Sequence, residues 1–238
     1  DLEKNDSNRR HEELYTLLQI ARESAATNPE LSRHFYRRVM RYPLDSHWHW
    51  ALYGLAKDNR PAADALYLEL LQNYQNETPR RLLFLSAYPF ASERIFGVDK
   101  FQYGGLPPAA LAPNSNLQIR FFDVFFTRVA RFAANPEEIN RPAEQRRLPE
   151  PAYIISALQD IEPIVMQNFP QLLERFSAAR SQANALLSVE LKETSEARKK
   201  LYANSGMTFE ERMERLKKAD LEGKLRDYYR GENGANLS

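Results

Sequence analysis

The chain has 238 residues, with 33 lysines and arginines against 32 aspartates and glutamates, so its formal net charge is +1. It contains no cysteine and only 8 glycines. The absence of cysteine excludes disulfides, thiolate nucleophiles and cysteine-ligated zinc or iron–sulfur sites. The balanced charge excludes a nucleic-acid binder that is basic throughout, although it leaves room for a local basic patch.

Phosphate-binding glycine loops and membrane-spanning stretches are also missing from the sequence. Neither the dinucleotide pattern G-x-G-x-x-G nor the P-loop pattern occurs. No uninterrupted apolar stretch approaches the roughly 18 residues that a transmembrane helix needs. Hydrophobic residues make up 43% of the chain and charged residues 27%, which is ordinary for a soluble globular protein. We expect a soluble chain without a cofactor or a transmembrane segment.

Proline marks the starts of the predicted helices. Asn28-Pro29, Thr78-Pro79 and Asn135-Pro136 each place a capping side chain before a proline that fits the first helical turn. Between these marks the apolar residues recur at intervals of three and four, which indicates helices. In chain order we expect helices over 8–26, 30–41, 46–57, 61–75, 79–88, 116–134, 137–147, 152–168 with an interruption at Pro163, 170–203 and 208–230. No strand alternation competes, so the predicted fold class is all-α.

The helix expected over 30–41 carries a basic face. Arg33, Arg37 and Arg41 are spaced i, i+4, i+8, and are therefore candidates for contact with a partner. The apolar stripe expected on the opposite side consists of Leu31, Phe35 and Val39. Such a face can bind RNA, an acidic peptide or a lipid surface. Alternatively, it is a solvated face whose arginines pair with acids on a neighbouring helix.

Two histidines flank a tryptophan in the next predicted helix. On a loop or strand, His47 and His49 would present both imidazoles on one side, as metal sites need. On a helix, residues two apart do not face each other, and the surrounding periodicity is helical. We therefore interpret both histidines as flanks of a core stripe anchored by Trp48, with Asp45 or Ser46 as the N-cap. A metal site at His47 and His49 stays the weaker alternative.

Helix pairs of this length are typical of α-solenoids. The segment Trp50-x2-Tyr53-Gly54 resembles the first half of the tetratricopeptide repeat pattern, and Ala63-x3-Tyr67-x2-Leu70 resembles the second. Pro79 stands near the proline that ends this pattern. The spacing between the halves is about three residues short, and Lys57 stands where the pattern has an aromatic residue. The resemblance covers about 30 residues and implies a helix-pair solenoid with extended binding surfaces.

The segment 97–115 interrupts the helical rhythm with three glycines and three prolines. A long structureless segment within a compact domain is commonly functional, a packed insertion or disordered. Its aromatic residues argue against disorder, so Phe101, Tyr103 and Leu106 are further partner-binding candidates. The segment divides a short-helix part, 1–96, from a part with longer helices, 116–238, unless all three form one continuous helical domain.

The C-terminal third is dense in alternating charges with a thin apolar stripe. Thr208 and Glu211 form a capping box for its last predicted helix, and Gly231 can end that helix. A long solvated helix with a narrow stripe needs a partner helix, either folded back or from another chain.

No convergent set of reactive residues is apparent. The sequence has no G-x-S-x-G and no H-E-x-x-H pattern, and we expect no catalytic residues. The preferred function is a non-catalytic helical-repeat protein that binds a protein partner or acts as an accessory subunit. The alternatives are a helical enzyme or ligand-binding domain with a site near His47, His49 and 97–115, and RNA binding through the basic face. Because the chain begins at Asp1, we expect a processed product or fragment, and its compartment stays open between cytoplasm and periplasm.

Overall fold

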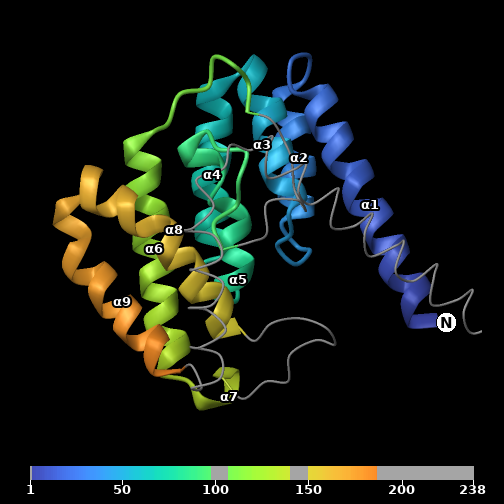
Figure 1. Cartoon of the computed structure of the whole chain (residues 1–238). Coiled ribbons are helices and arrows are strands. Elements are labelled where there is room, and N and C mark those ends of the chain that lie inside the picture. Colours follow the sequence, from blue (N-terminus) through green and yellow to red (C-terminus); the bar gives the residue numbers. More distant parts are fainter. Residues whose placement is uncertain (1, 98–106, 140–149, 187–238) are drawn as a thin grey trace, which may run out of the picture. The chain divides into compact units, whose positions relative to one another are not determined.

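A computed structural model of the chain describes residues 2–97, 107–139 and 150–186, with side chains from residue 12 onward. These residues form helices and no strand, so the all-α class is confirmed for them. The α-helices are α1 (Leu2–Ser24), α2 (Pro29–Val39), α3 (His47–Asp58), α4 (Arg60–Asn73), α5 (Pro79–Leu82), α6 (Ser115–Ala133), α7 (Pro136–Ile139), α8 (Glu150–Asn168) and α9 (Leu173–Ala185) (Figure 1). Short 3-10 helices are η1 (Leu83–Leu85), η2 (Tyr88–Phe90) and η3 (Pro170–Leu172).

Several sequence predictions fall beyond these residues. The helix predicted over 208–230, the later parts of the helices predicted over 137–147 and 170–203, and residues Phe101, Tyr103 and Leu106 lie outside the described part of the chain. The described residues on both sides of the segment 97–115 fall within one compact unit, residues 1–189. No described helix is long and apolar enough to cross a membrane.

The helices begin where the proline marks predict. The side chains of Asn28 and Thr78 accept hydrogen bonds from the backbone N–H three residues later, at 3.1 and 3.3 Å. Asn135 accepts one from Glu137 at 3.1 Å. At the start of α3 the capping oxygen belongs to Asp45. Local capping chemistry therefore determines these boundaries.

A single residue, Asn59, connects α3 to α4. Its backbone N–H donates to the carbonyl of Leu55 at 2.8 Å and ends α3. Its side chain accepts from the backbone N–H of Ala62 at 3.1 Å and begins α4. The two helices consequently share one capping residue.

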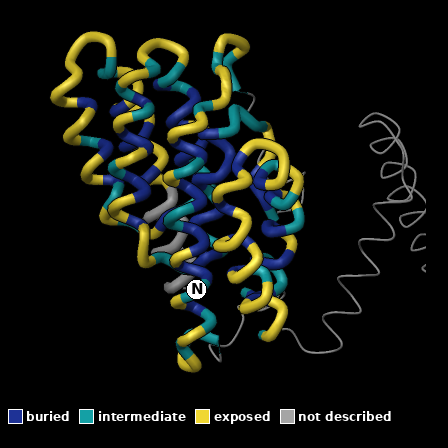
Figure 2. Tube along the Cα trace, turned by 90° about the vertical axis from the view of Figure 1, so that its left-hand side faces the viewer, coloured by how far each residue is buried: buried dark blue, intermediate teal, exposed yellow. Residues whose placement is uncertain are grey.

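The N-terminal helices pack in neighbouring pairs. α1 packs against α2, α3 against α4, and α1 against α3 (Figure 1). Each helix buries one side and exposes the other (Figure 2). The core between them contains the residues that the periodicity predicted on α1, α3 and α4, among them Leu14, Leu17, Leu18, Ala21, Trp48, Leu52, Leu55, Tyr67, Leu70, Leu71 and Tyr74.

The apolar stripe predicted on α2 is confirmed at Val39 but wrong at Leu31 and Phe35, since the neighbouring residues Ser32 and Tyr36 are the buried ones. The structure buries Ser32, Tyr36 and Val39 in this helix, whereas Leu31 is 42% exposed. The Ser32 hydroxyl donates to the backbone carbonyl of Ala21 at 2.7 Å, and the ring of Tyr36 packs 6.1 Å from that of Trp48. The tertiary hydrogen bond of Ser32 and the burial of the Tyr36 ring thus accompany a face of α2 that leaves Leu31 exposed.

Phenylalanine rings form much of the C-terminal core. α6 packs against α4, α5 and α9, and α8 packs against α5 and α9. Phe122 is fully buried, and its ring lies 5.5 Å from Phe90, 5.6 Å from Phe169 and 5.5 Å from Phe126. These rings come from η2, α6 and the residue before η3, so the cluster joins segments from both sides of 97–115.

Two predicted helices differ in detail from the structure. The helix predicted over 79–88 is split into α5, η1 and η2. Between η1 and η2 the Ser86 hydroxyl accepts from the backbone N–H of Phe96 at 3.0 Å, and after η2 the backbone turns left-handed at Ala91, with φ of 47°. The interruption predicted at Pro163 is wrong, because α8 continues through it. Pro163 is on the exposed side of α8, where water can bond the carbonyl that the proline leaves without a donor.

Candidate functional site

The arginines predicted to form a basic face are neutralised in part by neighbouring acids. Arg33 lies 3.2 Å from Glu30 on the same helix. Arg37 lies 3.5 Å from Glu69 on α4. Arg41 is exposed. The contact of Arg37 matches the alternative in which this face is solvated and paired with acids on a neighbouring helix, whereas Arg33 pairs within α2.

The two histidines lie on α3 in different surroundings. His47 begins the helix, where Asp45 accepts from its backbone N–H at 2.9 Å and lies 3.1 Å from its Nδ1. His49 is buried, with 5% of its surface exposed. The described residues hold no group of three or more histidines and acids that could bind a metal ion. Neither histidine lines the groove described next.

We expect the two histidines to change stability with pH in opposite directions. The hydrogen bond with Asp45 raises the pKa of His47, and burial lowers the pKa of His49. The stabilisation from His47 is therefore full below its ordinary value of 6.5 and is lost as the pH rises through its folded pKa. The stabilisation from His49 is full above 6.5 and is lost as the pH falls toward its folded pKa.

Urea unfolding of His47→Gln and His49→Gln between pH 5 and pH 8.5 tests this expectation. His47→Gln is expected to lower the free energy of unfolding more at the acid end, and His49→Gln more at the alkaline end. Wild-type protein measured in parallel is the reference. Parallel pH profiles for the two variants would contradict the assignment.

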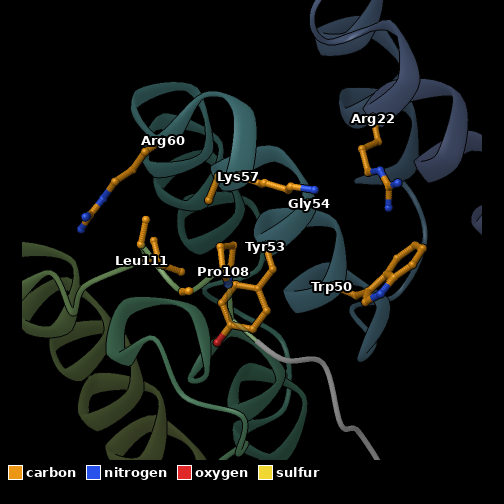
Figure 3. A pocket seen from close by; sticks show the side chains of 11 residues that line it. Arg22, Trp50, Tyr53, Gly54, Lys57, Arg60, Pro108 and Leu111 are labelled. Atoms are coloured by element: carbon orange, nitrogen blue, oxygen red, sulfur yellow. The ribbon is translucent and has the colours of Figure 1, made fainter.

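A groove of about 650 Å³ lies beside α3 (Figure 3). One wall is the irregular stretch 108–111, which precedes α6. The side chains that line the rest come from α1, α3 and α4, and include Arg22, Trp50, Tyr53, Lys57 and Arg60. None of the described lining residues carries a carboxylate or an imidazole. The groove is therefore cationic on one side and apolar on the other.

One face of α3 forms the floor of this groove. Trp50, Gly54 and Lys57 are spaced i, i+4, i+7 and so lie on the same side of the helix. A Cβ atom at Gly54 would lie 2.6 Å from Cδ of Arg22. The missing side chain at Gly54 thus leaves room for the Arg22 side chain to cross α3 between Trp50 and Lys57.

Arg22 is held by Trp50. Its guanidinium carbon lies 5.3 Å from the centre of the indole ring, which is a favourable cation–π distance. Tyr15 stacks with the same ring at 6.0 Å. Since seven residues span about 10.5 Å along a helix, Tyr15 and Arg22 reach Trp50 from well-separated points of α1.

The wall of the groove is anchored by Arg60 and Asp64 on α4. Arg60 donates to the carbonyl of Ala112 at 2.9 Å and lies 3.8 Å from Asp64. Asp64 accepts from the Tyr88 hydroxyl at 2.7 Å and from the Asn114 side chain at 3.1 Å. This network attaches the irregular stretch to α4 and so maintains the width of the groove.

Tyr53 is the lining residue with a hydroxyl that could act chemically, but that hydroxyl is already engaged. It donates to the carbonyl of Ser92 at 2.5 Å and lies 3.0 Å from that of Ala87. Burial raises the pKa of Tyr53 well above its ordinary value. Tyr53 is therefore a neutral packing residue.

No pattern in the sequence predicts this groove. Arg22, Lys57 and Arg60 belong to three helices, and their charges carry no shared spacing. The one local indication in the sequence is Gly54, because a glycine inside a helix destabilises that helix by roughly 1 kcal/mol relative to alanine. A glycine kept at such a position often serves packing or function.

Comparisons with protein-family models, curated proteins and solved structures give no significant match to this chain.

Proposed function

We propose that this chain is a non-catalytic helical module that binds a protein partner in the groove beside α3. The observation that carries the proposal is the lining: cationic side chains and one tryptophan face an apolar wall. Binding pockets in proteins commonly combine apolar walls with a few oriented polar groups. The groove has both features and, among its described lining residues, no acid–base pair for catalysis.

A tetratricopeptide-like arrangement of α1 to α4 is part of this proposal. The segments that resemble the repeat, Trp50 to Gly54 and Ala63 to Leu70, lie on α3 and α4, which pack against each other. α1 and α2 form the preceding pair, and α1 also contacts α3. Helix pairs stacked in this way support a binding surface made from several helices, and the groove takes residues from three of these four.

Blocking the groove tests the proposal. Ala110 is exposed on the groove wall, so Ala110→Trp adds a large side chain there without changing charge. Affinity purification from cells of the native source, quantified by mass spectrometry, is expected to recover a protein partner with the wild-type chain and at least about tenfold less with Ala110→Trp, because truncated or blocked contacts at a docking centre have large effects.

The matched control is Met166→Trp. Met166 is 62% exposed on α8 and does not line the groove, so the same indole is added elsewhere and the partner is expected to be retained. Urea unfolding should give similar stabilities for the two variants. Equal recovery with Ala110→Trp, or a wild-type chain that retains no partner, would contradict the proposal.

A further inference from the structure

The three cations of the groove are not equivalent. Arg60 is engaged by Asp64 and by the Ala112 carbonyl, and Figure 3 shows it directed away from Arg22 and Lys57. Arg60 therefore stabilises the wall. Among the described lining residues, Arg22 and Lys57 are the cations left to meet a ligand.

Neither Arg22 nor Lys57 has a carboxylate within 4 Å among the described side chains, and both are exposed. Their acidic neighbours in the sequence, Glu23 and Asp58, do not line the groove. Glu23 instead accepts a hydrogen bond from Gln19 at 2.9 Å. The positive charge of the groove thus lacks compensation from the described lining.

The contact with Trp50 orients Arg22 for recognition. A guanidinium over an indole keeps its N–H donors in its own plane, so they stay available to a planar acceptor. Carboxylates accept from such a fork with two parallel hydrogen bonds. Lys57, seven residues after Trp50 on the same face of α3, adds a point charge that suits a second carboxylate or the other edge of the first.

The remaining features favour a polypeptide over a nucleic acid. Single-stranded nucleic acids need aromatic faces on which bases stack, and the Trp50 ring is already in contact with Tyr15 and Arg22. The opposite wall, 108–111, reads Pro-Ala-Ala-Leu and offers apolar contact. A volume of about 650 Å³ accommodates a few side chains.

We infer that the groove binds an acidic segment of a protein partner, with Arg22 and Lys57 holding its carboxylates and the wall 108–111 contacting its apolar groups. This inference rests on the proposed function and adds the chemistry of the partner. Because the affinity comes from charge complementarity between the groove and the segment, binding must weaken as salt is added.

Titration calorimetry with short peptides tests the charge directly. At low salt, hexaglutamate is expected to bind the wild-type chain and hexaglutamine is not. Lys57→Gln is expected to weaken hexaglutamate binding about tenfold, as is typical for the loss of one close charge pair. Arg41→Gln, which removes one exposed positive charge from the turn after α2, is the matched control and is expected to bind as the wild type does.

Tryptophan fluorescence shows where the peptide binds. The chain has two tryptophans, of which Trp48 is fully buried and Trp50 is 39% exposed. Hexaglutamate is expected to change the emission of the wild type but not of Trp50→Phe. A signal that survives in Trp50→Phe places the peptide elsewhere and overturns the inference.

The other outcomes are equally decisive. The acidic-segment assignment is overturned if hexaglutamine binds as tightly as hexaglutamate, or if Lys57→Gln binds hexaglutamate as tightly as the wild type does. It is also overturned if inorganic phosphate or a uridine dodecamer binds more tightly than hexaglutamate. None of these results affects the capture of a partner that is lost in Ala110→Trp. Conversely, the Ala110→Trp variant can capture the partner as well as the wild type does while hexaglutamate binding still depends on Lys57. That result contradicts the proposed function but supports the recognition of carboxylates by the groove.

Discussion

Phe122→Ala is expected to lower the free energy of unfolding by about 3–5 kcal/mol. Phe122 is fully buried, and its ring contacts Phe90, Phe126 and Phe169 at centre distances of 5.5 to 5.6 Å. Truncation removes the buried ring and leaves a cavity whose lining loses its contacts. The aromatic pairs contribute beyond the area that they bury. Because domains are stable by only about 5–15 kcal/mol, this one change removes a large share of the total.

Urea unfolding monitored by circular dichroism measures the effect. Met166→Ala is the control, since that side chain is 62% exposed and exposed substitutions usually change stability by no more than about 0.5 kcal/mol. Phe122→Leu keeps much of the buried volume and is expected to fall between the two. A loss below about 1.5 kcal/mol for Phe122→Ala would show that the ring cluster repacks and does not anchor η2 and η3 to α6.

Gly97→Ala is expected to destabilise the fold by about 2–4 kcal/mol. Gly97 has a φ of 69°, in the region that favours glycine. A Cβ atom there would lie 2.7 Å from the carbonyl oxygen of Tyr153 and 2.9 Å from the backbone nitrogen of Ala157. These are backbone atoms of α8, which cannot move aside without disturbing the helix. The Gly97 N–H also donates to Asp160 at 2.9 Å, and this bond would be displaced.

Gly54→Ala is the matched comparison. Its added methyl group meets Cδ of Arg22 at 2.6 Å, which belongs to a flexible side chain that can rotate away. Alanine also favours a helix over glycine by roughly 1 kcal/mol. We therefore expect Gly54→Ala to change stability by less than about 1 kcal/mol while displacing Arg22 from its place over Trp50. Thermal and urea unfolding of Gly97→Ala and Gly54→Ala measure the two effects. Equal losses of stability in the two variants would contradict the distinction between a backbone contact at Gly97 and a side-chain contact at Gly54.

Helix starts and buried helix faces that depend on nearby residues could be predicted from the sequence. The starts of α2, α5 and α7 follow from an Asn-Pro or Thr-Pro pair, because the capping oxygen and the backbone N–H that donates to it lie within three residues of each other. The interior stripes of α1, α3 and α4 follow from apolar period alone.

Features that depend on contacts between distant segments could not be predicted from the sequence. On α2, Ser32 is buried in place of Leu31 and bonds to Ala21, eleven residues away. Ser86, between η1 and η2, bonds to Phe96, ten residues later. The groove combines Arg22 with residues 28 or more positions later in the chain, and its wall begins only at Pro108. No spacing rule connects such positions, so only the folded chain brings them together.

The joint at Asn59 has a dynamic consequence. Since this residue ends α3 and begins α4, the two helix ends cannot fray independently: loss of the Asn59 bonds exposes the amides of both at once. In hydrogen exchange we therefore expect the amides around Asn59 to open together. Lys57 and Arg60 lie on either side of this joint, so the shared cap fixes the distance between their backbones, and the backbone on this side of the groove needs no ordering when a ligand binds.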